Sequence, residues 1–326
     1  TKHNSLYLIR DRMGEKPLYY GWSGDSFLFG SELKSLKAFD DFSGEIDCNA
    51  LALYLKYDYV PSPYSIYKGI KKIPIGGYIK VDMVDNVWSR DGVSDINYYW
   101  SMNDIAKSGK GINKFNGSDE DAIQELDDLL SSAIKRQMLS DVPLGAFLSG
   151  GIDSSVVAAL MQKQSKKKIK TFTIGFNEKH YNEAEYAKEV ALHLGTEHTE
   201  LYISPEQAID VISRLPEVYD EPFADSSQIP TILVSKLAKR HVTVSLSGDG
   251  GDELFGGYNR YFMADRAWNK IEKIPFAVRK IISKGIILLS PKVWSFLINN
   301  AFKLLPKRFS MAHPGDKIYK LSKMLL

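Results

Sequence analysis

Seven consecutive residues, Ser149-Gly150-Gly151-Ile152-Asp153-Ser154-Ser155, combine groups that bind a polyphosphate. The two glycines have no Cβ, so their peptide N–H groups can approach an anion closely. The two serines would open a helix, where hydroxyls and unpaired amides point the same way. The carboxylate of Asp153 could hold a divalent cation against the phosphates. The run does not end in the Gly-Lys-Ser/Thr of a Walker loop, and its glycines do not have the spacing of a dinucleotide-binding fingerprint. It therefore predicts another kind of phosphate site.

A second glycine-rich loop that carries carboxylates is Ser247-Gly248-Asp249-Gly250-Gly251-Asp252-Glu253. Gly248 would admit a carbonyl or a ribose close to the main chain. If the two loops face one nucleotide, Asp153 and Asp252 could share a Mg²⁺ ion that bridges the phosphates. Alone, the second loop is also compatible with a surface turn. Its combination with the first loop favours a nucleotide site.

The elements around both loops alternate between strand and helix patterns. Apolar runs predict strands over Val142–Leu148, Lys170–Phe176, Glu197–Ile203 and Val242–Leu246. Helical patterns occupy residues 153–164, 182–194, 205–215 and 228–239, after an amphipathic helix that begins at Asp119. This alternation predicts an α/β fold, a parallel sheet with helices on both faces, with ligands at the carboxyl ends of the strands. Both loops follow such strands, and near Gly175 a backbone edge could read an adenine ring.

The segment Tyr219–Ser227 places polar side chains just before a predicted helix. They could recognise the amine and carboxylates of a substrate. Alternatively, Asp225, Ser226 and Ser227 cap the helix that follows. Both readings stay open from the sequence.

The first hundred residues have a different pattern. Short apolar runs separated by turn residues predict an antiparallel meander over residues 5–30. A short helix should follow with Ser31 as its N-cap, and a second should span Ile46–Tyr57 with Asp47 as its cap. Cys48, within that helix, is expected to be a small buried hydrophobic residue.

The first loop resembles the pyrophosphate loop, Ser-Gly-Gly-x-Asp-Ser, of the N-type ATP pyrophosphatases. Those enzymes cleave ATP between the α and β phosphates and adenylate an oxygen of their substrate. The segment Arg10–Tyr20, with Ser31-Glu32 and the turn at residues 73–77, resembles the latter part of the glutaminase domain of glutamine-dependent asparagine synthetases. In that family the glutaminase is an N-terminal-nucleophile fold whose first residue is the catalytic cysteine. This chain begins with threonine, so these residues are not expected to hydrolyse glutamine.

The resemblance to this family extends over nearly the whole chain and implies an adenine-nucleotide α-hydrolase-like (PP-loop) synthetase domain after the β-rich remnant of a glutaminase. It implies that ATP is held by Leu148, Ser149, Gly150, Gly151, Asp153, Ser154, Ser155, Ile174, Ser247 and Gly248. It also implies metal binding by Asp153 and Asp252, and catalytic positions at Ser247 and Asp249. Some synthetases have glutamate and related β-lactam synthetases have tyrosine where Asp249 stands, which leaves the acceptor open. A lysine that the family uses to steady the transition state would lie beyond Leu326.

The implied reaction is ATP-dependent amidation of a carboxylate through an acyl-adenylate, releasing AMP and pyrophosphate, with aspartate as the first choice of acceptor and glutamine-derived ammonia as the nitrogen source. ATP and Mg²⁺ are the implied cofactors. One alternative is an amidotransferase that acts on another carboxylate, such as a sugar acid or a β-amino acid. Another is a nucleotide-binding remnant without catalysis. RNA-modifying enzymes with the same loop are a weaker alternative, because they carry a basic surface that this composition lacks.

The predicted organisation is a glutaminase part over residues 1–101, a linker over 102–118 and a synthetase part over 119–326. The linker lies in a stretch, residues 88–118, with few apolar positions. The chain has 326 residues, which favours two domains. Because it starts with Thr1 and lacks a signal-like segment, we expect it to be an internal portion of a longer protein.

The composition gives no sign of a nucleic-acid or membrane partner, so small molecules are the expected partners. A net charge of +2 gives no reason to expect nucleic acid or an anionic membrane. The single cysteine excludes an internal disulfide and a multi-cysteine metal site, and favours a reduced cytoplasm. The most apolar stretch, residues 276–304, is interrupted by charges and Pro291, which predicts two amphipathic helices and no membrane span. The sequence leaves the oligomeric state open, a homodimer included.

Overall fold

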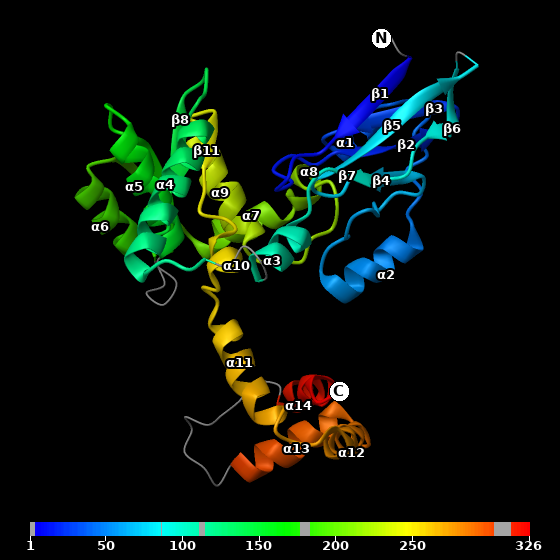
Figure 1. Ribbon diagram of the computed structural model, residues 1–326, viewed down its shortest axis with the longest axis vertical. Helices are drawn as coiled ribbons and strands as arrows, with labels where there is room; N and C mark the ends of the chain where they lie inside the picture. Colours follow the sequence, from blue (N-terminus) through cyan, green and yellow to red (C-terminus); the bar gives the residue numbers. More distant parts are fainter. Residues whose placement is uncertain (1–3, 86, 111–114, 177–182, 303–313) are drawn as a thin grey trace. The chain divides into compact units, whose positions relative to one another are not determined.

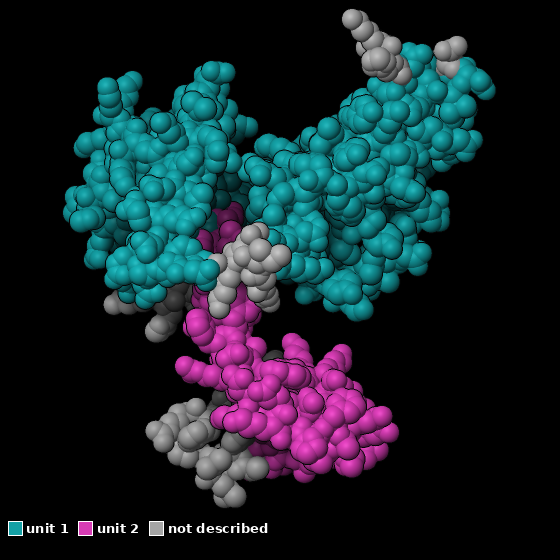
Figure 2. All heavy atoms as spheres, in the orientation of Figure 1, with its two compact units in different colours: residues 1–248 teal, residues 249–326 magenta. Residues whose placement is uncertain are grey.

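The computed structural model describes residues 4–85, 87–110, 115–176, 183–302 and 314–326. The chain forms two compact units, residues 1–248 and residues 249–326 (Figure 2). Every strand among the described residues belongs to the first unit. The elements are labelled along the chain in Figure 1.

The beginning of the first unit is built from antiparallel strands. These are β1 (Ser5–Ile9), β2 (Tyr19–Ser23), β3 (Ser26–Gly30), β4 (Ile70–Lys72), β5 (Gly77–Val84), β6 (Val87–Val93) and β7 (Asn97–Tyr98). β2 pairs with β3 and β4, whereas β1, β6 and β7 pair with β5. The predicted meander is therefore wrong for β1. Leu8 lies opposite Ile79 and shares a core with Tyr20 and Val81, a long-range arrangement that local periodicity does not encode.

Two short helices follow β3, and they differ in how they are capped. α2 (Cys48–Tyr57) begins as predicted, with the Asp47 side chain accepting from the amide of Asn49 at 2.8 Å. Cys48 is exposed, contrary to expectation, because it lies in the first turn while Ala50 faces the core. α1 (Leu33–Lys37) has Glu32, not Ser31, at its N-cap, and Glu32 makes no side-chain cap hydrogen bond.

The polar stretch 88–118 contains more regular structure than its composition predicts. β6 and β7 both pair with β5, and α3 (Met102–Lys110) lies inside the predicted linker. Tyr99 ties this stretch to the N-terminal strands, since its amide donates to the Gly76 carbonyl at 3.0 Å and its hydroxyl to the Arg10 carbonyl at 2.8 Å. Backbone hydrogen bonds hold this stretch in regular structure although its sequence has little apolar periodicity.

The rest of the first unit contains a parallel sheet, which confirms the predicted α/β fold. Its strands are β8 (Leu144–Phe147), β9 (Lys170–Phe176), β10 (Glu197–Ile203) and β11 (Val244–Leu246). They pair in the order β10-β9-β8-β11, and each pairing is parallel. β8 and β11 are neighbours although about a hundred residues lie between them along the chain, so the order of the strands reverses between β8 and β11.

Helices cover both faces of this sheet. They are α4 (Asp119–Gln137), α5 (Ile152–Gln164) and α6 (Ala184–Leu194) on one face and α9 (Gln228–Ala238) on the other. α7 (Pro205–Ile212) packs on α9, and the short α8 (Leu215–Val218) follows it along the chain. Ala146 and Leu148 pack with residues of α4, α5 and α6, whereas the intervening Phe147 packs with α9. Alternate residues of one strand thus face opposite helix layers. α4 begins with a Ser118–Asp121 capping box, and α6 is followed by left-handed Gly195.

A half-buried histidine within the sheet predicts a pH-dependent stability. Nδ1 of His198 lies 2.8 Å from the Thr171 hydroxyl, and Nε2 has no hydrogen-bond partner among the described residues. Burial lowers the pKa of His198 below its ordinary 6.5. The unfolded chain therefore binds the proton first, and we expect stability to fall as the pH drops below about 6.5.

Urea unfolding at pH 7.5 and at pH 5.5 measures this effect. The His198→Asn variant should show a smaller loss of stability over this interval than the parent protein. His193→Asn, at an exposed position on α6, is the matched control and should keep the parent's dependence. Equal pH dependence in the parent and the His198 variant would contradict the assignment.

The second unit consists of helices in its described residues. These are α10 (Gly251–Phe255), α11 (Asn259–Ile271), α12 (Phe276–Ile287), α13 (Pro291–Phe302) and α14 (Pro314–Met324). The break between α12 and α13 falls at Ser290-Pro291, as predicted. Across the described residues, no helix by itself has the length and apolar character to cross a membrane. Only α12 combined with residues 291–298 of α13 reaches both, and that pair is bent by 91°.

Candidate nucleotide-binding site

Two loops leave the parallel sheet at the point where its strand order reverses. Ser149–Ser155 follows β8, and Ser247 follows β11. Because the strands are parallel neighbours, with Ala146 opposite Leu246, both loops start at the same edge of the sheet. In open α/β sheets this reversal opens a crevice at the carboxyl ends of the strands, where ligands bind. The structure therefore places Ser247 and Gly248, which begin the second predicted segment, at the same edge of the sheet as the first segment.

The first loop is held in shape by hydrogen bonds among its own serines. The Ser154 hydroxyl accepts from the Ser149 amide at 3.1 Å and lies 2.9 Å from the Ser149 hydroxyl. Ser155 donates its hydroxyl to the Gly151 carbonyl at 2.7 Å. Ser154 is buried and Ser149 is exposed. Ser154 thus acts mainly on the shape of the loop, while Ser149 faces the solvent side where an anion would arrive.

The amide end of α5 opens towards the same side. Its N-cap is Gly151, which has no side chain to accept from the first-turn amides. These N–H groups and the helix dipole favour negative charge at this end. Asp153 lies in this first turn and is half-buried. Phosphates bound there would be repelled by the Asp153 carboxylate. A cation between the phosphates and Asp153 would offset this repulsion.

Gly150 makes the loop's tight turn possible. Its φ of +81° is in the left-handed region, and a Cβ placed there would lie 2.7 Å from the amide nitrogen of Ala187 and 2.7 Å from the Cβ of Tyr186. Both neighbours belong to α6. The turn therefore packs directly on a helix backbone, and only a residue without a side chain fits.

Gly248, the last residue of the first unit, lies directly against the first loop. A Cβ at this position would lie 2.7 Å from the amide nitrogen of Ser154 and 2.9 Å from the carbonyl carbon of Asp153. Both atoms are backbone atoms of the first turn of α5, so they cannot move aside as a flexible side chain would. The absence of a side chain at Gly248 sets the spacing between the two loops.

The other predicted nucleotide contacts lie at the ends of strands. Leu148 is only 1% exposed and its amide donates to the Phe172 carbonyl at 2.9 Å, so its side chain belongs to the core. A contact from Leu148 to a nucleotide would use its carbonyl. Ile174 is half-buried near the end of β9, and Ser247 is half-buried after β11. Their roles in binding stay predictions.

Asp249 and Asp252 belong to the second unit. Asp252 lies in the short helix α10, and its carbonyl accepts from the amide of Gly257 at 3.0 Å. A Cβ at Gly257 would overlap Oδ1 of Asp252, so glycine leaves room for the carboxylate. The pairing of Asp153 with Asp252 around a metal, and the catalytic role of Asp249, stay predictions.

The donor set suits Mg²⁺ in chemical character. Mg²⁺ prefers oxygen ligands and is often held by one or two carboxylates together with phosphate oxygens. No group of three or more His, Cys, Asp or Glu side chains suited to a metal occurs in the described parts of the chain. A site of the predicted kind needs fewer protein ligands than that. Asp153 would supply a carboxylate at the anion-binding end of α5.

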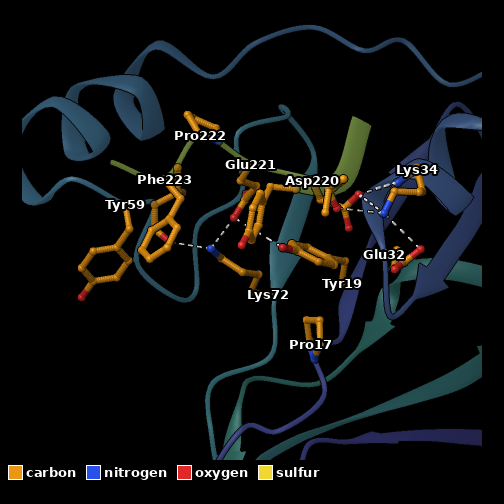
Figure 3. A pocket seen from close by; sticks show the side chains of 13 residues that line it. Pro17, Tyr19, Glu32, Lys34, Tyr59, Lys72, Asp220, Glu221, Pro222 and Phe223 are labelled. Atoms are coloured by element: carbon orange, nitrogen blue, oxygen red, sulfur yellow. Dashed lines mark hydrogen bonds and ion pairs between the residues drawn. The ribbon is translucent and has the colours of Figure 1, made fainter. Parts of the chain in front are cut away.

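The segment Tyr219–Ser227 has a role that the sequence did not reveal. Asp225 accepts a hydrogen bond from the Ser227 amide at 2.8 Å just before α9, which lowers the pKa of its carboxyl. Ser227 is the N-cap of α9 and makes no side-chain cap hydrogen bond, so the capping that the sequence offered as an alternative is not formed by this side chain. Asp220 and Glu221 contact Leu33 of α1 and Lys72 of β4, respectively (Figure 3). They line a pocket of about 380 Å³ together with Tyr19 and Lys72. The acidic pair before Pro222 is the only sequence signal for this contact.

Two family models match this chain. The model of the asparagine synthase family matches residues 125–322, and the glutamine amidotransferase domain matches residues 1–99. The putative asparagine synthetase [glutamine-hydrolyzing] 2 of Methanocaldococcus jannaschii is 38% identical over 308 residues, 93% of this chain and 57% of the relative. Asparagine synthetase [glutamine-hydrolyzing] 1 of Bacillus subtilis is 36% identical over 278 residues, 85% of this chain and 41% of the relative.

The chain spans about half the length of these curated relatives. Among solved structures, the NH3-dependent NAD synthetase from Campylobacter jejuni is a much weaker match, with 18% identity, 42% of this chain and 60% of that chain covered, and a TM-score of 0.31. The family match covers most of the residues that form the parallel sheet and both loops. This chain belongs to the asparagine synthase family.

Proposed function

We propose that the protein containing this chain uses ATP to amidate the side-chain carboxylate of aspartate, with ammonia derived from glutamine. The observation that carries the proposal is the contact of Gly248 with the first turn of α5 at the point where the strand order reverses. This contact places Gly248, the first glycine of the second glycine-rich loop, against the pyrophosphate-type loop. Membership of the asparagine synthase family, and relatives named as glutamine-hydrolysing asparagine synthetases, support the choice of reaction.

The reaction would proceed in two displacements. A carboxylate oxygen of aspartate attacks the α-phosphorus of ATP, the bond to the bridging oxygen of the β-phosphate breaks, and pyrophosphate leaves with the bonding electrons. Ammonia then attacks the acyl carbon of the resulting β-aspartyl-AMP, a proton is lost, and AMP leaves. ATP is converted to AMP and pyrophosphate, and the carboxylate becomes an amide.

The residues of this chain would bind and orient the reactants. The glycines and serines of residues 149–155 would hold the β and γ phosphates through amides and hydroxyls. Leu148, Ile174 and Gly248 would border the adenosine. Mg²⁺, when held by Asp153 and Asp252, would neutralise charge on the leaving pyrophosphate. Ser247 and Asp249 would lie near the acyl group, where Asp249 would influence which acceptor is chosen.

Pyrophosphate release tests the proposed acceptor. The full-length protein should release pyrophosphate from ATP faster with aspartate than with glutamate, a uronic acid or a β-amino acid, when ammonia is supplied. Asp153→Ala should lose most of this release. A response to aspartate no better than to the other acids would favour an amidotransferase with a different acceptor. No release with any acid, by the parent or the variant, would favour a nucleotide-binding protein without catalysis.

We further propose the domain organisation that the sequence predicted, a glutaminase part over residues 1–101, a linker over 102–118 and a synthetase part over 119–326. The family matches to residues 1–99 and 125–322 support this division. The cytoplasm is the proposed compartment, and the proposed partners are small molecules. A homodimer is proposed as the assembly to test first by size-exclusion chromatography with light scattering.

A further inference from the structure

Asp220 caps a helix that lies 187 residues earlier in the chain. Its Oδ2 accepts from the Leu33 amide at 2.8 Å, and its Oδ1 accepts from the Lys34 amide at 3.3 Å. These are the first amides of α1, the helix whose own N-cap makes no side-chain hydrogen bond. The Asp220 side chain is only 11% exposed, and it also pairs with the Lys34 ammonium at 3.3 Å. A carboxylate at this end of a helix is favoured by both the amides and the dipole.

Glu221, the next residue, contacts the same N-terminal part of the first unit, which comprises β1 to β7, α1 and α2 (Figure 3). Its Oε2 lies 2.6 Å from the Lys72 ammonium, and its Oε1 accepts from the Ile66 amide at 2.8 Å. The two side chains of this ion pair are 11% and 10% exposed for Lys72 and Glu221. Lys72 also donates to the Val60 carbonyl, and Tyr19 donates its hydroxyl to Glu221 at 3.4 Å. The carboxylate is therefore paired and hydrogen-bonded on both oxygens.

Burial makes this ion pair demanding in its geometry. Burial lowers the pKa of Lys72, against the opposing effect of Glu221. For Tyr19, burial and the nearby Glu221 charge raise the pKa. A buried pair of this kind adds little net stability over apolar side chains, but removing one partner leaves an uncompensated charge. The pair therefore acts mainly by fixing how the Glu221 and Lys72 segments are placed against each other.

The acidic dipeptide is connected to the nucleotide site through α9. The Ala224 amide donates to the Asp58 carbonyl at 2.8 Å, and the Gln228 side chain at the start of α9 donates to the Phe223 carbonyl at 2.6 Å. At its other end, α9 packs through Leu237 and Ala238 on Phe172 of β9. The chain then continues through β11 to Gly248, which contacts α5. A displacement of residues 220–224 would therefore reach the loops at the end of the sheet.

We propose that Asp220 and Glu221 are positioning residues that hold the segment before α9 on the N-terminal part. Through α9, they keep the nucleotide site at a fixed position relative to that part. The inference rests on the proposed function, because it assigns the two carboxylates to coupling between nitrogen supply and amide formation. In this proposal the carboxylates of Asp220 and Glu221 do not bind the substrate, because both already accept hydrogen bonds within the protein.

The contact itself is tested by hydrogen exchange of the full-length protein, which needs no activity. Glu221→Gln and Asp220→Asn should reduce protection of the amides of Ile66 and Leu33, respectively, by at least about threefold in exchange rate. Lys68→Met, which breaks the exposed Lys68–Glu45 pair on the same part, is the matched control and should leave both amides unchanged. Unchanged protection in the Asp220 and Glu221 variants would overturn the proposal.

The positioning role is tested by counting asparagine formed for each glutamine hydrolysed, beside synthesis driven by added ammonia. Lys72→Met should lower the ratio at least about threefold while the ammonia-driven kcat changes less than twofold. The double variant Lys72→Met with Glu221→Gln should recover part of the ratio, because it removes the unpaired buried charge. An unchanged ratio in Lys72→Met would overturn the positioning role. Failure of the parent to make asparagine even from ammonia would instead refute the proposed function, and the exchange experiment would still decide the contact.

Discussion

Replacing Gly248 by alanine should lower ATP-dependent pyrophosphate release about a hundredfold, a loss typical of a misplacement near 1 Å in a catalytic site. The added Cβ would lie 2.7 Å from the Ser154 amide nitrogen and 2.9 Å from the Asp153 carbonyl carbon. Both are backbone atoms, so relief requires the two loops to move apart. That movement would displace the amides of α5 and the carboxylate of Asp153 together. Initial rates of pyrophosphate release at saturating ATP measure the effect.

The matched control for Gly248→Ala is Gly285→Ala. A Cβ at Gly285 meets no atom of the described residues within 4 Å, and the position lies inside α12. Alanine is the better helix former, so this variant should keep the parent's activity and should be no less stable. Urea unfolding of both variants separates a local change at the site from a loss of folding. Full activity in a folded Gly248→Ala protein would show that the spacing of the loops does not matter for the reaction.

Replacing Gly150 by alanine should destabilise the first unit by about 2–5 kcal/mol, as the sum of two costs. A left-handed backbone costs an alanine about 1–2 kcal/mol, and overpacking adds about 1–3 kcal/mol. The overpacking arises because the new Cβ would lie 2.7 Å from the backbone nitrogen of Ala187. Urea unfolding monitored by circular dichroism gives the change in free energy of unfolding. Pyrophosphate release should fall as well, since the turn presents the loop amides.

Gly195→Ala separates the two costs. Gly195 has a φ of +69°, and a Cβ there meets nothing within 4 Å among the described residues. This variant should therefore show only the backbone cost of about 1–2 kcal/mol. The difference between the two variants measures how tightly the loop packs on α6. Equal destabilisation by both substitutions would rule out the close packing of Gly150 against Ala187.

The contacts of Asp220 and Glu221 change how the segment before α9 is interpreted. From the sequence, these carboxylates belonged to a segment, Tyr219–Ser227, whose polar side chains could recognise a substrate. Their hydrogen bonds to α1, Ile66 and Lys72 assign them to the N-terminal part. Selection of the acceptor then has to come from other groups, and Asp249 is the residue for which the family resemblance implies such a role.

Local signals account for the features that the sequence alone determined. The parallel α/β alternation, the helix cap at Asp47 and the end of α6 at Leu194 all agree with the structure. Each depends on residues within a few positions of one another, through periodicity, side-chain capping or left-handed glycine. The pyrophosphate-type loop belongs to this group, because a strand, a glycine turn and a helix start are contiguous in the chain.

Tertiary structure decided the features that join distant residues. β1 pairs with β5 instead of β2, α1 is capped by Asp220 instead of Ser31, and Glu221 pairs with Lys72, 149 residues away. The contact of Gly248 with α5 likewise follows from the sheet order, which brings β11 beside β8. Local propensity carries no information about such partners, because their energies arise from burial and pairing after the chain has folded. The sequence by itself therefore predicted a phosphate site at the first loop, and the fold decided that Gly248 lies against the start of α5.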